Sequence, residues 1–235
     1  MLTNTRIGPE TGDPASFKSF ADVWDAFVTQ LNHLVALGCQ GTSIVQKGQA
    51  GRLPLPFYSS TRWDPISKAK DLTEGGARYP HSGCNNVGLS TAADSLTAIK
   101  QLVFDEHKID WDDLLEGLRT DFAGKTELQN TLLNDAPKYG NDNDEADQMA
   151  SNVHMAHYAA LEDKVTAFGG RYLLLIFNTN HLVVVSHGSR TAATPDGRGA
   201  RKPVGISVSP SEGRDVSGPK AAMRSICKLD QTAIP

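Results

Sequence analysis

The sequence predicts an α/β protein that is rich in helices and contains a few buried strands. Several segments between residues 19 and 163 carry apolar side chains at the i, i+3, i+4 and i+7 spacing of amphipathic helices. One later run, Tyr172 to Phe177, is continuously apolar, follows Gly169-Gly170, and has the length of a strand buried on both faces. A chain of 235 residues can bury a substantial core, and neither an internal repeat nor a linker divides it.

The first expected helix follows a polar, turn-rich stretch at residues 1–15. Ser19 and Asp22 have the spacing of a capping box, and Gly38 is a natural stop for the helix. The apolar residues between them share one helical face: Phe20, Val23, Trp24, Phe27, Leu31, Leu34 and Val35. Residues 40–90 contain Gly, Pro and Ser throughout, so we expect them to be irregular.

Four further helices are expected in the middle of the chain. They cover residues 91–106, 111–122, a short segment from 126, and 145–163. Asp110 is positioned to cap the second of these, and Pro137 must end the third. The acidic residues that begin the fourth complement the positive end of a helix dipole.

The last quarter of the chain changes pattern. After the strand at Tyr172–Phe177, we expect a second strand at Leu182–Ser186. From Ser189 onward the sequence is mostly turns, with a short helix at Lys220–Ile226.

Composition excludes several classes of function. A net charge of −4 and a pI near 6.0 argue against nucleic acid or an anionic membrane as the main partner. No apolar stretch approaches the roughly 20 residues that span a bilayer, and residues 1–20 lack the apolar middle of a secretory signal. Cys39, Cys84 and Cys227 are odd in number and widely spaced, which is typical of a reducing compartment. We therefore expect a cytoplasmic protein.

Two groups of residues suggest chemistry of their own. His154 and His157 lie at i, i+3 on an expected helix, a spacing that binds metals in helical bundles, although zinc needs three or four ligands. An independent metal-binding helical protein is thus one alternative. Cys39 and Cys84 each follow a glycine, but Cys39 comes after the negative end of the first expected helix, which disfavours a thiolate. A structural role is favoured for both thiols.

The segment after the first strand is polar where a buried strand should be apolar. Asn178, Asn180 and His181 lie within four residues after Phe177. If these side chains are buried, they need hydrogen-bond partners from protein, water or a ligand. Side-chain alternation gives Asn178 and Asn180 one face and His181 the other. A structural role is favoured here too, and a pocket-lining role is the alternative.

Several motifs, in order along nearly the whole chain, carry a family resemblance. These motifs resemble the glycyl radical enzymes of the pyruvate formate-lyase superfamily, and the resemblance runs on to Cys227–Asp230. The motifs are residues 8–14 (GPETGDP), 70–79 (KDLTEGGARY), 93–104 (ADSLTAIKQLVF), 134–142 (NDAPKYGND), 192–198 (AATPDGR) and 207–219. The resemblance implies a segment of an α/β barrel built from two half-barrels, with a cysteine loop and a glycine loop meeting in its centre. An enclosed site suits radical chemistry, because the radical must be kept from water and oxygen.

The resemblance also implies an activity. Such enzymes act in anaerobic metabolism as lyases, dehydratases, decarboxylases or formate acetyltransferases, cleaving C–C or C–heteroatom bonds through a thiyl radical. A separate activating enzyme with an iron–sulfur cluster and S-adenosylmethionine installs the glycyl radical, so no cofactor is expected to bind this chain directly. The expected partners are that activating enzyme, a small-molecule substrate, the remainder of the barrel and, at full length, further copies of the same enzyme.

The sequence departs from this family at both radical positions. The family pattern Cys-x-Glu is absent, because Cys39 is followed by Gln40-Gly41 and Cys84 by Asn85-Asn86. No Arg-Val-x-Gly-Tyr segment occurs near the C-terminus. We therefore interpret residues 1–235 as one partial pyruvate formate-lyase-type domain without catalytic residues of its own, inactive alone, in which Asn178, Asn180 and His181 line the substrate site. The alternative is a non-catalytic complementing or interaction subunit from a split or decayed gene.

Overall fold

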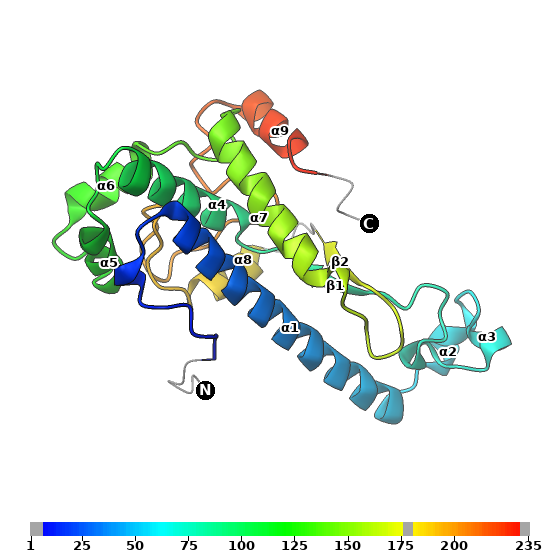
Figure 1. Ribbon diagram of the computed structural model, residues 1–235. Helices are drawn as coiled ribbons and strands as arrows, with labels where there is room; N and C mark the ends of the chain where they lie inside the picture. The colour runs from blue at the N-terminus through cyan, green and yellow to red at the C-terminus, as the bar shows by residue number, and fades with distance from the viewer. Residues whose placement is uncertain (1–6, 176–180, 231–235) are drawn as a thin grey trace.

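The computed structural model describes residues 7–175 and 181–230 (Figure 1). The helices are α1 (Phe20–Arg52), α2 (Pro56–Ser60), α3 (Pro65–Lys68), α4 (Leu89–Ala98), α5 (Trp111–Arg119), α6 (Thr126–Asn134), α7 (Asp144–Glu162), α8 (His181–Gly188) and α9 (Pro219–Cys227). The strands are β1 (Ser82–Asn85) and β2 (Tyr172–Leu175). Short 3-10 turns cover Pro14–Ser16 and Leu72–Glu74, and a π-helical stretch, Ile99–Asp105, continues α4. The chain is thus helix-rich with a small sheet, which confirms the predicted class.

Helix α1 begins where the sequence predicts and ends much later. Ser19 and Asp22 form the full capping box, with the backbone N–H groups of both residues bonded to the partner side chain. The predicted stop at Gly38 is wrong, because the helix continues to Arg52. Its second half packs on α7 and the sheet, and Gln46 there accepts a hydrogen bond from the backbone N–H of Ala167 at 3.2 Å. Tertiary packing thus outweighs the low helix propensity of glycine.

The core lies between α4 and α7, with the N-terminal half of α1 against it. Leu89, Ala93, Leu96 and Leu102 are buried on the α4 side, and Ala150 and Val153 on the α7 side. The predicted helices at 91–106, 111–122, 126 onward, 145–163 and 220–226 are confirmed to within a few residues. The side chain of Asp110 accepts from the N–H groups of Asp112 and Asp113, as an N-cap should.

Strands β1 and β2 form a two-stranded parallel sheet, with Ser82 opposite Tyr172 and Asn85 opposite Leu175. The strand predicted at Tyr172 is confirmed over its described part, Tyr172–Leu175. Strand β1 lies in the region we expected to be irregular, because the sequence Ser-Gly-Cys-Asn has almost no intrinsic strand preference. Pairing with β2 determines its conformation.

The strand predicted at Leu182–Ser186 is wrong, since these residues belong to helix α8. A short apolar run is compatible with a buried strand or a buried helix, and periodicity does not separate the two. In the structure Val184 is buried, while Leu182 and Val185 are exposed, which is the one-sided burial of a helix on a surface.

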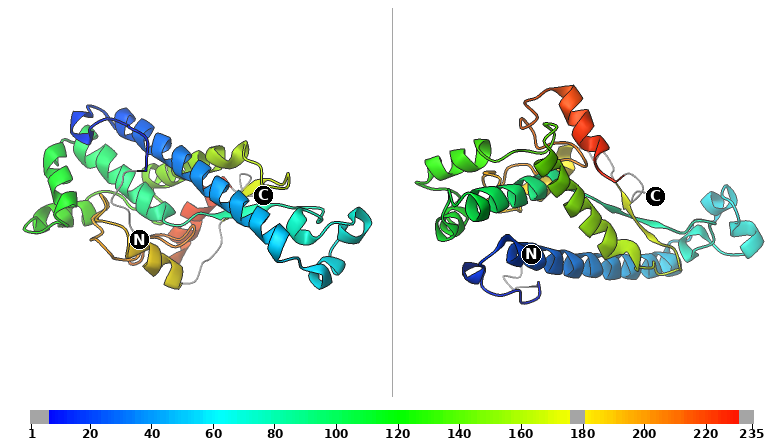
Figure 2. Two further views of the ribbon diagram at one scale, coloured as in Figure 1. Left: turned by 90° about the horizontal axis from the view of Figure 1, so that it is seen from below. Right: turned by 45° about the horizontal axis from the view of Figure 1, so that its top comes forward.

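Two views agree that α2 and α3 form a small lobe at the end of α1, far from α5 and α6 (Figures 1 and 2). Phe57, Trp63 and Ile66 of this lobe are 85, 75 and 73% exposed, and Ile44 and Val45 on α1 are also exposed. Large apolar side chains that are exposed together mark an interaction surface.

Candidate functional site

The two faces of the sheet have different surroundings. On one face, Cys84 of β1 and Tyr172 and Leu174 of β2 pack with Val35 and Cys39 of α1 and with Leu161 of α7. The Tyr172 hydroxyl donates to the carbonyl of Cys39 at 2.8 Å. On the other face, Gly83 and Asn85 are exposed, and Leu173 and Leu175 are half-buried. The sheet is therefore covered by helices on one side and open on the other.

Cys84 is a structural thiol in this arrangement. Its Sγ atom lies 3.6 Å from Nε2 of His157, which projects from α7. Burial raises the pKa of the Cys84 thiol, and burial lowers the pKa of His157 to about 4. Both groups are therefore neutral near pH 7, so the pair is no thiolate–imidazolium couple. Burial also raises the pKa of the Cys39 thiol, and Cys227 is exposed.

His154 lies one helical turn before His157 and is completely buried. Burial lowers the pKa of His154, and the charge and the backbone of Asp230 act in the opposite direction. Within residues 7–175 and 181–230, no group of three or more His, Cys, Asp or Glu side chains is arranged to hold a metal ion. Among the described residues, the two imidazoles thus lack the further ligands that the alternative of a metal-binding helical protein requires.

A buried polar side chain follows the carboxyl end of β1. Asn86 follows β1, is 5% exposed, and bonds through its backbone N–H to the carbonyl of Leu175. Its side-chain Nδ2 has no hydrogen-bond partner in the described residues. Asn85 and Asn86 were not predicted as site residues, because the strand that positions them has almost no signal in the sequence.

The predicted pocket residues are only partly covered by the structure. Asn178 and Asn180 lie outside the described residues. His181 is the first residue of α8, and its side chain also lies outside the description. All three follow β2 in the chain.

A cavity of about 350 Å³ is lined by residues of α4 and of the loops around residues 196–214. Buried charges line it: Asp94 on α4, Lys138, and Asp196. Asp94 accepts from the Tyr139 backbone N–H at 2.8 Å and from Ser211 Oγ at 3.3 Å, while burial raises its pKa to about 7. Burial lowers the pKa of Lys138, whose Nζ donates to the Leu132 carbonyl.

The motif at residues 192–198 folds as a turn that Arg198 holds together. Its guanidinium donates to Thr194 Oγ1 at 3.1 Å, and to the carbonyls of Gly199, Lys202 and Ala192. Gly197 has a φ of +91°, and a Cβ there would lie 2.5 Å from Leu133 Cγ. The motif is therefore a structural loop pressed against α6, and the Asp196 backbone N–H also donates to Ser95 Oγ on α4 at 3.3 Å.

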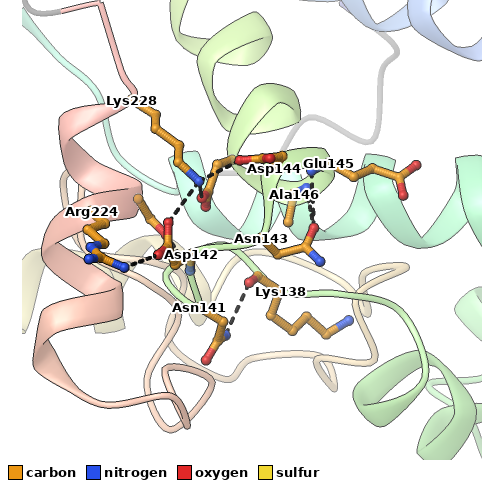
Figure 3. Close-up of polar contacts among 11 residues, drawn as sticks. Lys138, Asn141, Asp142, Asn143, Asp144, Glu145, Ala146, Arg224 and Lys228 are labelled. Atoms are coloured by element: carbon orange, nitrogen blue, oxygen red, sulfur yellow. Dashed lines mark hydrogen bonds and ion pairs between the residues drawn. The ribbon is translucent and has the colours of Figure 1, made fainter.

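Figure 3 shows a second polar network, which ties α9 to the start of α7. Lys228 Nζ lies 2.8 Å from both Asp144 and Asp147 and 3.0 Å from Asp142, and Arg224 also pairs with Asp142. Asn143 caps α7 by accepting from the N–H groups of Glu145 and Ala146. The network fixes α9 over the start of α7.

Comparison with known proteins identifies the family. The model of the family described as pyruvate formate lyase-like matches residues 1–185. The chain belongs to this family. The resemblance to glycyl radical enzymes seen in the sequence is thereby confirmed. One similar solved structure is a glycyl radical enzyme from Archaeoglobus fulgidus. It is 31% identical, with a TM-score of 0.87, over 93% of this chain and 28% of that one.

Named relatives are dehydratases and lyases. Trans-4-hydroxy-L-proline dehydratase of Clostridioides difficile is 37% identical over 97% of this chain and 29% of its own length. The solved, glycerol-bound form of the B12-independent glycerol dehydratase from Clostridium butyricum is 39% identical with a TM-score of 0.92, over 97% of this chain and 29% of that one. The chain thus spans under a third of the length of these relatives, and its fold matches a partial segment of their structures.

Proposed function

We propose that this chain forms part of the barrel wall of a glycyl radical enzyme, as one partial domain over residues 1–235. The observation that carries the proposal is the match to glycerol dehydratase, with a TM-score of 0.92 over 97% of this chain but only 29% of that enzyme. The open face of the sheet and the exposed apolar side chains of α1, α2 and α3 support it, because a barrel segment needs further polypeptide to cover those surfaces.

The radical centre belongs to polypeptide outside this sequence. The chain has no Cys-x-Glu pattern, and the thiol of β1, Cys84, points to the helix-covered face with a raised pKa. A thiol that must abstract a hydrogen atom from substrate has to reach the substrate, which Cys84 does not. The chain alone is therefore inactive.

The substrate of the complete enzyme is a small hydroxylated molecule that loses a group by C–heteroatom cleavage. The named relatives support this class, since two of them are dehydratases of glycerol and of trans-4-hydroxy-L-proline. Asn178, Asn180 and His181 supply amide and imidazole groups to the substrate site, where they bind hydroxyl or carboxylate oxygens.

The complete enzyme needs partners that follow from this chemistry. An activating enzyme with an iron–sulfur cluster and S-adenosylmethionine installs the glycyl radical, and the full-length protein is a cytoplasmic homo-oligomer. No helix within residues 7–175 and 181–230 is long and apolar enough to cross a bilayer.

A segment replacement tests the proposed function. The part of C. butyricum glycerol dehydratase that matches this chain is replaced by residues 1–235, and the purified graft is treated anaerobically with the activating enzyme and substrate. Formation of a glycyl radical and turnover of glycerol or a related diol are expected. A graft that folds and forms the radical but dehydrates no hydroxylated substrate would contradict the proposal.

A further inference from the structure

Asn85 is the last residue of β1, and its side chain points away from the helices. Side chains alternate along a strand, so Asn85 faces opposite to Cys84. Cys84 contacts His157 of α7 and packs on the helix-covered side. Asn85 therefore stands on the open face, where it is exposed and makes no side-chain hydrogen bond within the described residues.

The same face is apolar elsewhere along these strands. Leu173 and Leu175 of β2 are half-buried there, and Gly83 of β1 has no side chain. Leu175 lies over Gly83, since a Cβ on Gly83 would be 2.1 Å from its Cδ1. Asn85 is thus the one polar side chain that β1 presents on this face, at an apolar wall next to the strand ends.

In enzymes built on parallel strands inside a shell of helices, the helix-free face is the interior, and substrates bind at the carboxyl ends of the strands. Here α1 and α7 cover one face, so the face that carries Asn85 is the interior one. Asn85 is paired in register with Leu175, the residue before the segment that leads to Asn178 and Asn180. We propose that Asn85 contacts the substrate and that its carboxamide binds a substrate hydroxyl group as donor or acceptor. This inference rests on the proposed function.

A protection experiment on the unactivated graft tests this inference without any radical. Asn85→Cys is introduced, and alkylation by iodoacetamide is followed at residue 85 by peptide mass spectrometry, with and without glycerol. The adjacent Cys84 is an internal control, because it points to the helix-covered face. At a glycerol concentration ten times the Kd, alkylation of residue 85 is expected to slow by about tenfold, while the rate at Cys84 stays unchanged.

Two results would overturn the inference. One is an alkylation rate at residue 85 that saturating glycerol leaves unchanged, and the other is rapid labelling by a bulky polyethylene glycol maleimide, which would put residue 85 on the outer surface. The same cysteine at the matched position of the ungrafted dehydratase, which binds glycerol in its solved form, gives the answer if the graft binds no glycerol. Loss of radical formation or turnover in the graft would instead count against the proposed function, since the protection assay requires neither.

Discussion

The carboxylate of Asp94 accepts a hydrogen bond from the backbone N–H of Tyr139 at 2.8 Å, across 45 positions of sequence. Asp94 is 1% exposed, and Lys138 and Ser211 surround the same carboxylate. This contact joins α4, the loop before α7 and the C-terminal loops. It places an ionisable group in the centre of the fold, where the group affects stability.

Because burial raises the pKa of Asp94 to about 7, from an ordinary value of 3.8, the folded chain retains this proton at pH values where the unfolded chain has lost it. Between pH 3.8 and about 7, the Asp94 contribution to the free energy of unfolding therefore falls as pH rises. Asp94→Asn keeps an oxygen acceptor for Tyr139 and removes the charge. Relative to wild type it should gain on the order of 2 kcal/mol between pH 5 and pH 8, measured by urea unfolding.

Asp25→Asn, an exposed position on α1, is the matched control and should keep the wild-type pH dependence. An Asp94→Asn variant with the same pH profile as wild type would show that the carboxylate is not desolvated as the structure indicates.

The buried imidazole of His157 gives the opposite pH dependence: its contribution to the free energy of unfolding rises as pH rises. Burial, with a smaller contribution from His154, lowers its pKa to about 4, so the unfolded chain binds a proton first as pH falls from 6.5. The stability that depends on neutral His157 is complete above pH 6.5 and is lost as pH falls toward 4. His157→Gln should reduce the loss of unfolding free energy between pH 7 and pH 4.5 by on the order of 2 kcal/mol. Exposed His187→Gln should leave that loss unaltered; equal losses in both variants would refute the assignment.

Two glycines with positive φ angles allow the cost of backbone strain to be distinguished from the cost of steric crowding. Gly197 has φ +91° and lies against Leu133, whereas Gly213 has φ +73° and no atom within 4 Å of an added Cβ. Gly213→Ala should lower the free energy of unfolding by about 1 kcal/mol through backbone strain alone. Gly197→Ala should lower the free energy of unfolding by about 3 kcal/mol, because the new Cβ would also clash with Leu133. Denaturant unfolding measures both, and similar costs would mean that the loop does not press on α6.

The exposed apolar side chains predict self-association of the isolated chain. Phe57, Trp63 and Ile66 in the α2–α3 lobe are all more than 70% exposed. Sedimentation velocity should show concentration-dependent species larger than a monomer. The triple change of these residues to Ser should shift the distribution toward monomer, while Lys68→Ser in the same lobe should not. A wild-type chain that remains monomeric at high concentration would contradict the interpretation of this surface.

Local signals explain what the sequence predicted well. The capping box of Ser19 and Asp22, the N-cap Asp110 and the apolar periodicity of 145–163 act within one or two helical turns. Each gave the start of its helix to within one residue. Gly38 failed as a stop because distant residues pack on the helix beyond it. Strand β1 was missed because its conformation comes from pairing with β2, about 90 residues later.

The candidate site was less predictable than the helices. The direction of a side chain on a strand depends on which face the helices cover, and neither Asn85 nor Cys84 carries that information locally. A structural role was favoured for Cys84 from sequence, but its neighbour in the structure, His157, lies 73 positions away and has no local signal. Family membership, in contrast, was visible in the ordered motifs, which include the Arg198 turn and the residues around Asp94.

Electron paramagnetic resonance of the purified 235-residue chain, incubated anaerobically with an activating enzyme and S-adenosylmethionine, tests the central claim most directly. We predict no glycyl radical doublet and no turnover of glycerol, against a positive signal from intact C. butyricum glycerol dehydratase in parallel. A doublet on the isolated chain would mean that a radical-bearing glycine lies within these residues, and the account of an incomplete barrel wall would be wrong.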